Sequence, residues 1–95
     1  MKITTKFSNT SWEPKMKCKY IIVKHGRTEQ PFVFSELSVH SDIAYAVGGE
    51  VVGAGFCFID ENRYHCYGES ISCNVKTRGE KDEKVLNEML GVDLC

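Results

Sequence analysis

The sequence predicts a small α+β domain, in which a mostly antiparallel four- to five-stranded sheet carries a C-terminal helix packed on one face. Three patterns indicate this fold: β-branched runs between 18 and 34, a hairpin pattern between 50 and 75, and an amphipathic stretch from 77 to 91. A chain of 95 residues with 42% hydrophobic side chains has room for one core. We therefore expect residues 1–95 to form a single domain.

The first part of the chain is polar and is followed by two predicted strands. Residues 1–17 form a polar N-terminal segment, within which 2–7 alternate as in a short strand. The run 18–24 is apolar on both faces, which is typical of a central strand. Residues 30–34 return as a second strand, and Pro31 near its start indicates a sheet edge or a bulge.

The segment 35–47 favours short helical pieces over a strand. Ser35 is a candidate N-cap, because its hydroxyl can accept a backbone N–H at a helix start. The helix face would then be shared by Leu37, Ser41 and Ala44. The sheet is thus expected within 18–75, with a short helical insert.

The segment 50–75 predicts a hairpin that turns at 60–63. The expected cross-strand pairs are Phe58 with His65, Phe56 with Tyr67, Ala54 with Glu69, and Val52 with Ile71. The opposite face then carries small side chains: Gly53, Gly55, Cys57, Cys66, Gly68, Ser70 and Ser72. Because glycine weakens a strand, we expect a bulky group against this face, either a packed helix or a ligand.

A helix start signal precedes the last amphipathic stretch. Thr77 and Glu80 have the spacing of a capping box, in which each side chain accepts a backbone N–H. Acidic residues in the first turn suit the helix dipole, and Gly91 is a natural stop. The apolar stripe consists of Val85, Leu86, Met89 and Leu90. A helix over 77–91 would bury this stripe against the sheet.

Charge is divided unevenly along the chain, although the net charge is only −1. Residues 1–27 carry seven basic residues and one acidic residue, a net of +6, whereas 28–95 carry five basic and twelve acidic residues, a net of −7. The basic part is suited to phosphate or to a nucleic-acid strand. In the alternative interpretation, the basic edge meets the acidic helix within the molecule or between two copies.

The cysteines and the start of the chain indicate a reducing compartment. No long apolar stretch follows the first lysine, so we expect neither a secretory signal nor a membrane anchor. Five cysteines, an odd number, favour free thiols in a cytosol. Their spacings lack the close pairs of structural zinc sites, so the sequence predicts no metal and no cofactor.

Polar residues from three segments make up the predicted ligand-binding site. Its members are His40, Asp42, Tyr67, Ser70, Ser72, Lys76 and Arg78. Lys76 and Arg78 flank the predicted helix start, whose free N–H groups favour an anion. A tyrosine, Tyr67 or Tyr64, could stack on a nucleobase. In the structural alternative, these side chains cap a turn, pair with a lysine or face solvent.

The sequence predicts no catalytic residues. A thiol nucleophile built from Cys57 or Cys66 with His40 would need a neighbouring oxyanion site, and no loop of that kind is present in the sequence. No phosphate-binding glycine motif is present either. We therefore expect a protein that is not an enzyme.

Several stretches resemble a family of small α+β accessory proteins of tailed bacteriophages and prophages. They are His40–Ala44, Val51–Phe56 and Cys66–Ser72, followed by Arg78 and Asp82. The resemblance covers about residues 18–91. It implies a viral accessory protein in the host bacterial cytoplasm. Small phage proteins without enzyme motifs often disarm host defences, by gripping an immune protein or by sequestering its nucleotide signal.

Three functions from different classes follow. The first is a non-enzymatic counter-defence factor that binds a nucleotide immune signal, such as a cyclic nucleotide or another phosphate-bearing small molecule, stoichiometrically. The alternative is a protein-binding inhibitor of a host defence or regulatory protein. The second alternative is a nucleic-acid-binding module that uses the basic N-terminal region. A homodimer or higher homo-oligomer is expected, because the strand at 30–34 offers a free edge.

Overall fold

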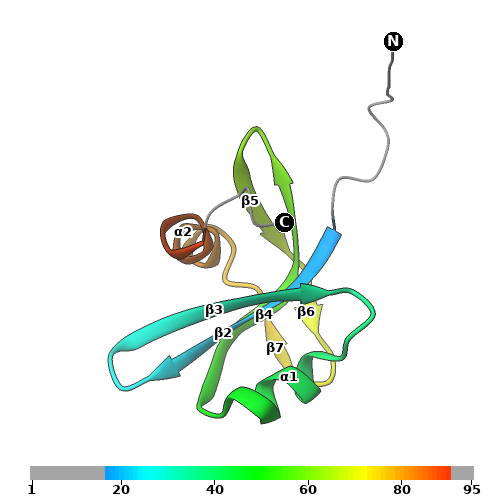
Figure 1. The fold of residues 1–95 in the computed structure, drawn as a ribbon, viewed down its shortest axis with the longest axis vertical. Coiled ribbons are helices and arrows are strands. Elements are labelled where there is room, and N and C mark those ends of the chain that lie inside the picture. The colour runs from blue at the N-terminus through cyan, green and yellow to red at the C-terminus, as the bar shows by residue number, and fades with distance from the viewer. Residues whose placement is uncertain (1–16, 91–95) are drawn as a thin grey trace.

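The computed structural model describes residues 17–90 and shows an α+β fold, which confirms the predicted fold class (Figure 1). In chain order the elements are β2 (Lys17–His25), β3 (Thr28–Ser35), α1 (His40–Val47), β4 (Glu50–Asp60), β5 (Arg63–Tyr67), β6 (Glu69–Ser70), β7 (Val75–Lys76) and α2 (Glu80–Met89). The strand predicted at 2–7 lies outside the described residues. So does Gly91, the predicted helix stop.

Four antiparallel strands form the main sheet in the order β3-β2-β4-β5. The apolar run in β2 is central, as predicted, and four consecutive side chains of it, Tyr20 to Val23, are fully buried. Successive strand residues point to opposite faces, so both faces of β2 must be covered. Strand β3 lies at the edge, which agrees with the position of Pro31.

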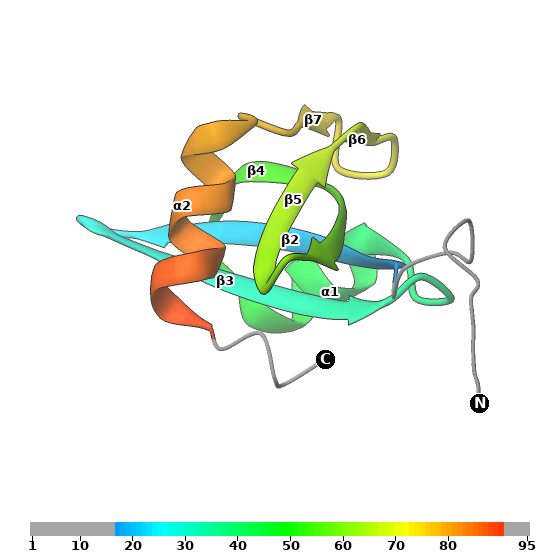
Figure 2. The same cartoon turned by 90° about the horizontal axis from the view of Figure 1, so that it is seen from above.

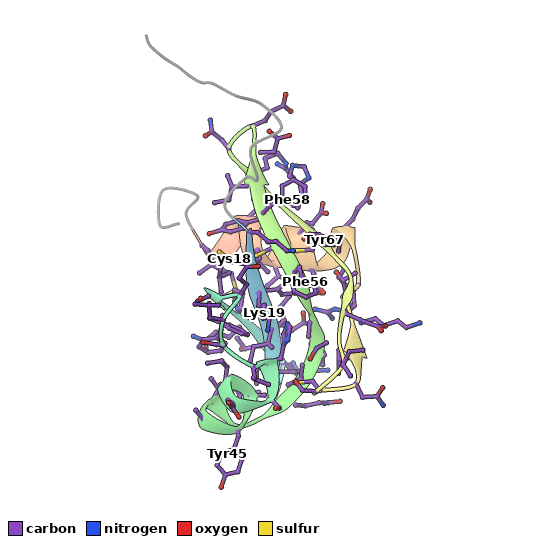
Figure 3. The ribbon with its side chains drawn as sticks, turned by 90° about the vertical axis from the view of Figure 1, so that its right-hand side faces the viewer. Cys18, Lys19, Tyr45, Phe56, Phe58 and Tyr67 are labelled. Atoms are coloured by element: carbon purple, nitrogen blue, oxygen red, sulfur yellow. The ribbon has the colours of Figure 1, made fainter. Side chains whose placement is uncertain are left out.

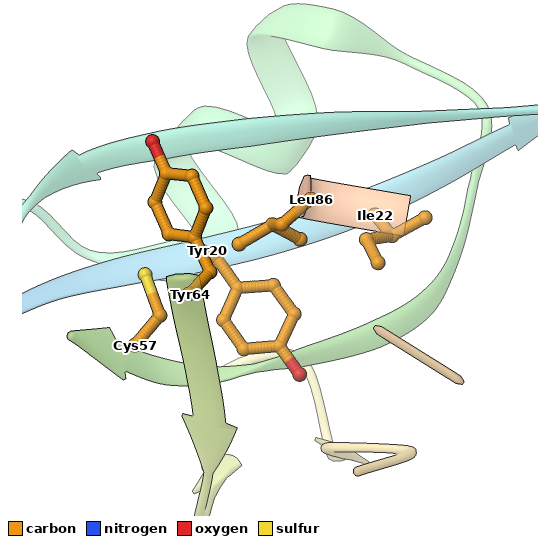
Figure 4. Close-up of a cluster of buried hydrophobic side chains, with 5 residues drawn as sticks. All are labelled: Tyr20, Ile22, Cys57, Tyr64 and Leu86. Carbon is orange, nitrogen blue, oxygen red and sulfur yellow. The ribbon is translucent and has the colours of Figure 1, made fainter. Parts of the chain in front are cut away.

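The two helices cover opposite faces of the main sheet (Figure 2). The core beneath α2 is built from Tyr20, Ile22, Cys57, Tyr64 and Leu86 (Figure 4). The core beneath α1 is built from Ile21, Val23 and Ala54, with Ile43, Ala44 and Val47 of α1 packed on it. Leu86 is fully buried, and burial of a leucine side chain contributes about 1.5–3 kcal/mol.

A β-bulge in β4 allows this strand to serve both cores. Ile22 of β2 pairs with Gly53. The next residue, Val23, pairs with Val51, so Val52 is the extra residue. The extra residue reverses the alternation of side chains, and Val52 therefore joins the core beneath α2, while Val51 joins the core beneath α1.

The predicted hairpin pairing is confirmed near the turn and wrong beyond it. Phe58 pairs with His65 and Phe56 pairs with Tyr67, as expected. The predicted pairs of Ala54 with Glu69 and of Val52 with Ile71 do not form, because β5 ends at Tyr67. After a left-handed residue at Gly68, with φ of 79°, the chain leaves the main sheet. It then forms the separate two-stranded sheet of β6 and β7.

The helical insert is confirmed within 35–47, but its predicted cap and face are wrong. Ser35 is the last residue of β3, and its hydroxyl accepts the N–H of Leu37 within the turn that follows. Helix α1 begins only at His40. Leu37 is 91% exposed and therefore belongs to no buried face.

The C-terminal helix is confirmed, but its capping box is wrong. Helix α2 begins at Glu80 after Gly79, and no side chain caps it. The hydroxyl of Thr77 accepts the N–H of Gly79 and lies 2.6 Å from the hydroxyl of Tyr20. The hydroxyl of Thr77 is therefore held by a tertiary contact and does not cap α2, in contrast to the prediction from the local motif.

Side chains of α2 occupy the outer edge of β5. The amide of Asn87 accepts the N–H of Tyr64 at 2.8 Å and donates to the carbonyl of Tyr64 at 3.3 Å. The carboxylate of Glu83 accepts the N–H of Cys66 at 2.9 Å. These contacts satisfy backbone groups that an uncovered edge strand would offer to another chain.

Candidate functional site

The face of small residues in β4 is filled by the protein itself. The carboxylate of Asp82, from α2, lies where a side chain at Gly53 would begin. At Gly55 a Cβ would meet the carbonyl oxygen of Tyr67 at 2.5 Å, because the chain crosses closely there. Of the two occupants that the sequence left open for this face, the helix is present at Gly53.

A buried polar network surrounds Asp82, whose side chain has no exposed surface. Its carboxylate accepts the hydroxyl of Tyr20 and both the backbone N–H and the Nε–H of Arg78. Burial raises the pKa of Tyr20 above its ordinary value, and the bond to Asp82 adds to the rise. Tyr20 is thus a neutral donor in this network.

All three guanidinium nitrogens of Arg78 donate to carboxylates of the protein. Its two terminal nitrogens donate to Glu29 at 2.7 and 3.2 Å, and its Nε donates to Asp82. The bonds to Glu29 contribute most to raising the pKa of Arg78, and the same pairing lowers the pKa of Glu29. The structure therefore uses Arg78 to join α2 to β3, and the arginine is not presented to an anion.

The remaining predicted site residues are divided between separate places. Lys76 lies opposite Glu69 in the small sheet and faces solvent. Ser70 is buried, and its hydroxyl accepts the N–H of Cys73. Asp42 lies on the exposed side of α1. The positive charge expected from Lys76 and Arg78 is therefore not gathered with the other members of the predicted site.

Two predicted residues, His40 and Ser72, line one hollow with a volume of ≈ 480 Å³. It lies between the start of α1, strand β4 and the chain that follows β5. Its lining residues are Lys19, Val39, His40, Phe56, Gly68, Glu69, Ile71 and Ser72. A third predicted residue, Tyr67, stacks on Phe56 at the margin of this hollow. The structure thus brings His40, Tyr67 and Ser72 together, and the buried Ser70 lies next to them, with its Oγ 3.4 Å from Ser72 Oγ.

Hydrogen bonds hold the walls of the hollow in place. Ser72 Oγ accepts the N–H of Ser41 at 3.1 Å, which ties the loop after β6 to α1. The ammonium group of Lys19 donates to the carbonyl of Ser38 at 2.7 Å. His40 Nε2 lies 2.8 Å from the carbonyl oxygen of Gly55, and burial lowers the pKa of His40. These bonds come from four different segments, so the hollow is a feature of the folded chain.

Six rings form a continuous row that leads out of the hollow, here called the aromatic row. In spatial order they are Phe34, His40, Phe56, Tyr67, Phe58 and His65, with centroid separations of 5.5, 5.9, 5.7, 5.9 and 5.1 Å. Phe56–Tyr67 and Phe58–His65 are stacked, and Tyr67 is 40% exposed. Sequence reasoning predicted these two pairs separately, but it did not connect them to His40 and Phe34.

Lysines of β2 lie beside the aromatic row. The ammonium of Lys17 lies 5.4 Å from the centroid of the Phe56 ring, within the range of a cation–π contact. Lys19 lines the hollow two residues further on. Figure 3 shows Lys19, Phe56, Tyr67 and Phe58 along one side of the molecule. The basic first part of the chain thus contributes positive charge to a surface of partly exposed rings.

The thiol and histidine considered as a nucleophile and base do not form a pair. Cys66 packs with the core beneath α2, whereas His40 lies at the opposite helix, against Gly55. Burial raises the pKa of the Cys66 thiol to about 12, with the charges of Asp82 and Glu83 adding to the rise. A thiol with this pKa is protonated at neutral pH and is a poor nucleophile.

Residues 17–90 hold no group of three or more His, Cys, Asp or Glu side chains that could bind a metal ion. In the same part of the chain, no helix has the length and hydropathy needed to cross a bilayer. Comparisons of the chain with models of known protein families, with curated proteins and with solved structures find no match.

Proposed function

We propose that this protein is a non-enzymatic binding protein that captures a nucleotide on the aromatic row. The observation that supports the proposal is the row itself: rings from β4 and β5, partly open to solvent, with Lys17 above one of them. Stacked rings beside a cation match the two parts of a nucleotide, which are a flat base and a charged phosphate.

The stacking surface is centred on Tyr67. This ring is 40% exposed and contacts the rings of Phe56 and Phe58, so it is held in place before a ligand arrives. A base that stacks on such an aromatic ring gains about 1–3 kcal/mol. Because the ring is already ordered by its neighbours, little of this gain is lost to side-chain entropy.

Lys17 and Lys19 supply the positive charge for the phosphate. Lys17 is exposed, so its charge is available to a ligand. The predicted partners Lys76 and Arg78 contribute less, since Arg78 is engaged by Glu29 and Asp82. The proposed site therefore keeps His40, Tyr67 and Ser72 from the sequence prediction and replaces its cations with the lysines of β2.

The proposed biological role is stoichiometric capture of a nucleotide immune signal by a phage counter-defence factor in the host cytoplasm. This part of the proposal is supported by the resemblance to phage accessory proteins. A cyclic nucleotide is the first ligand class to test, because it offers a base and a phosphate in a compact molecule. Capture without turnover is consistent with the raised pKa of Cys66.

A second candidate function, a protein-binding inhibitor, is favoured by the apolar rim of the hollow. Ile71 is 81% exposed and Val39 is 45% exposed, and both line the hollow; Leu37, two residues before Val39, is 91% exposed. Exposed apolar side chains that lie together often mark a protein interface. Recovery of one host protein from a lysate, lost when Leu37 and Ile71 are both changed to Ser, would support this candidate over the nucleotide.

The nucleotide proposal is tested with a panel of cyclic mono- and dinucleotides and short single-stranded oligonucleotides. Binding is measured by calorimetry and by the shift in melting temperature. A ligand at 100 times its dissociation constant adds about 2.7 kcal/mol of stability, which is readily seen in a small domain. Tight binding of oligonucleotides alone would identify the nucleic-acid alternative, and no binding by any member of the panel would overturn the proposal.

Two matched variants test whether the ligand binds at the aromatic row. Tyr67→Ala is expected to weaken binding by about 1–3 kcal/mol, or roughly 5- to 150-fold. Tyr45→Ala is the control, because Tyr45 is 92% exposed on α1 and makes no ring contact within the described chain. Equal losses in the two variants would show that the aromatic row is not the binding surface.

A further inference from the structure

We infer that the hollow at the inner end of the aromatic row recognises the amino group of a nucleobase, which donates a hydrogen bond to Nδ1 of His40. This inference rests on the proposed function and specifies the base that the site selects. It depends on a buried acceptor, His40, which is 4% exposed and lines the hollow.

The contact with Gly55 fixes the tautomer of His40. A backbone carbonyl can only accept, so the hydrogen bond of 2.8 Å to the oxygen of Gly55 requires a proton on Nε2. Burial lowers the pKa of His40, which keeps the ring neutral. In a neutral ring protonated at Nε2, Nδ1 is an acceptor.

No hydrogen-bond donor to this acceptor comes from the described residues. Within residues 17–90, the polar contact of the His40 ring is the one to Gly55, and its other contacts are edge-to-face with Phe34 and Phe56. A buried acceptor without a donor costs free energy, so such groups are usually paired. A ligand that brings an N–H into the hollow removes this cost.

Charge in the hollow favours the base end of a nucleotide over its phosphate. Glu69 lines the hollow, and its carboxylate repels an anion while it can accept a second N–H. Lys19, the cation that lines the hollow, donates to the carbonyl of Ser38, so it adds its charge to the site while the exposed Lys17 is left to contact the phosphate directly. The phosphate is therefore directed outward, toward Lys17 beside Phe56.

The walls of the hollow fit a flat apolar group. Val39 and Ile71 provide aliphatic surface, and Phe56 provides a ring. Gly68 leaves the wall beside Phe56 free of a side chain, because a Cβ there would lie 3.0 Å from the ring of Phe56. The volume of ≈ 480 Å³ falls within the range of about 300–1,000 Å³ found for small-molecule sites.

These features select a base that carries an exocyclic amino group. Adenine and cytosine both present an –NH₂ group at the base edge, whereas hypoxanthine presents a carbonyl at the corresponding position. Two acceptors, His40 Nδ1 and the Glu69 carboxylate, suit the two N–H bonds of an amino group. A carbonyl in the same place would face both acceptors and find no donor.

The first test compares three ligands on the unchanged protein: 3′,5′-cyclic AMP and its analogues that carry purine or hypoxanthine in place of adenine. Loss of a hydrogen bond to a buried group predicts that each analogue binds about 5- to 100-fold more weakly by calorimetry. Equal affinity for adenine and purine would overturn the inference while leaving the proposed function intact. Failure of all three to bind would also overturn it, and the wider nucleotide panel would then decide the proposed function separately.

The second test observes the histidine directly by ¹⁵N NMR of the imidazole rings. Cyclic AMP is expected to shift the Nδ1 resonance of His40 toward that of a hydrogen-bonded acceptor, and the purine analogue is expected to leave it near the free position. His25, exposed at the end of β2, is the internal control. An unchanged His40 Nδ1 resonance in a saturated complex would contradict the inference, and no variant is needed that might fail to fold.

Discussion

The carboxylate of Asp82 lies at the place where a side chain on Gly53 would begin. The side chain of Asp82 therefore leaves no room for a side chain at Gly53. The buried polar network depends on the absence of a Cβ at this position of β4. The bonds from Tyr20 and Arg78 hold the carboxylate there, so it cannot move aside without losing partners.

Gly53→Ala is therefore expected to destabilise the protein by about 1–3 kcal/mol, as overpacking of a core does. Urea unfolding measures the loss. The double variant Gly53→Ala with Asp82→Ala is the control, because removal of the carboxylate makes room for the methyl group. The two substitutions should then cost less together than the sum of their separate costs. Simple additivity would show that the two residues do not compete for space.

Asn87→Ala is expected to expose the edge of β5. The N–H and the carbonyl of Tyr64 would both lose their partner, which should cost about 1–3 kcal/mol in urea unfolding. Amide hydrogen exchange at Tyr64 should accelerate, and self-association should increase because the edge becomes available. Glu88→Ala, the exposed neighbour on α2, should change none of these properties. Equal behaviour of the two variants would assign no role to the amide of Asn87.

His40 should make stability depend on pH below its ordinary pKa of 6.5. Because the pKa of His40 is lower in the folded state, the unfolded chain binds the proton more readily. The free energy of unfolding is therefore highest above that pH and falls as the pH drops toward the lowered pKa. The variant His40→Gln should show a flatter profile in this window, whereas His25→Gln should keep the slope. A slope that survives in His40→Gln would have another origin.

Cys66 should resist alkylation in the folded protein. With a pKa of about 12, roughly one thiol in ten thousand is ionised at pH 8, and the thiolate is the reactive form. Mass spectrometry after treatment with iodoacetamide should find Cys66 unmodified in native protein and modified in urea. Rapid modification of the native protein would show that the thiol is more open and more acidic than its surroundings imply.

The parts of the fold that depend on local pattern could be predicted from the sequence. The hairpin pairing near its turn follows from loop length and alternation, which fix Phe56 opposite Tyr67. The central position of β2 follows from the apolar side chains on both of its faces. Beyond Tyr67 the alternation continues in the sequence, but the left-handed backbone at Gly68 turns the chain out of the main sheet. Alternation alone does not predict such a turn.

The candidate site was harder to predict, because its chemistry is decided by distant partners. Thr77 and Arg78 have the sequence context of a cap and of an anion site. In the structure, the hydroxyl of Thr77 bonds with the hydroxyl of Tyr20. The guanidinium of Arg78 donates to the carboxylate of Glu29, which lies 49 residues earlier in the chain. The contact of His40 with Phe56 depends on how α1 packs on the sheet. A signal was present in the sequence, since the ring pairs of the hairpin were predicted and the lysines belonged to the basic part of the chain, but their proximity depends on the pairing of β2 with β4.

The extra residue at Val52 can be changed or removed without turning either half of β4 over. Replacement of Val52 by another aliphatic residue would leave each half of the strand oriented as it is. Deletion of Val52 would place Val51 directly before Gly53 in regular alternation, so that Val51 would still face the core beneath α1, while the core beneath α2 would lose one side chain. A homologous chain that lacks this residue should therefore keep the strand pairing, and deletion of Val52 should cost stability mainly through the lost side chain.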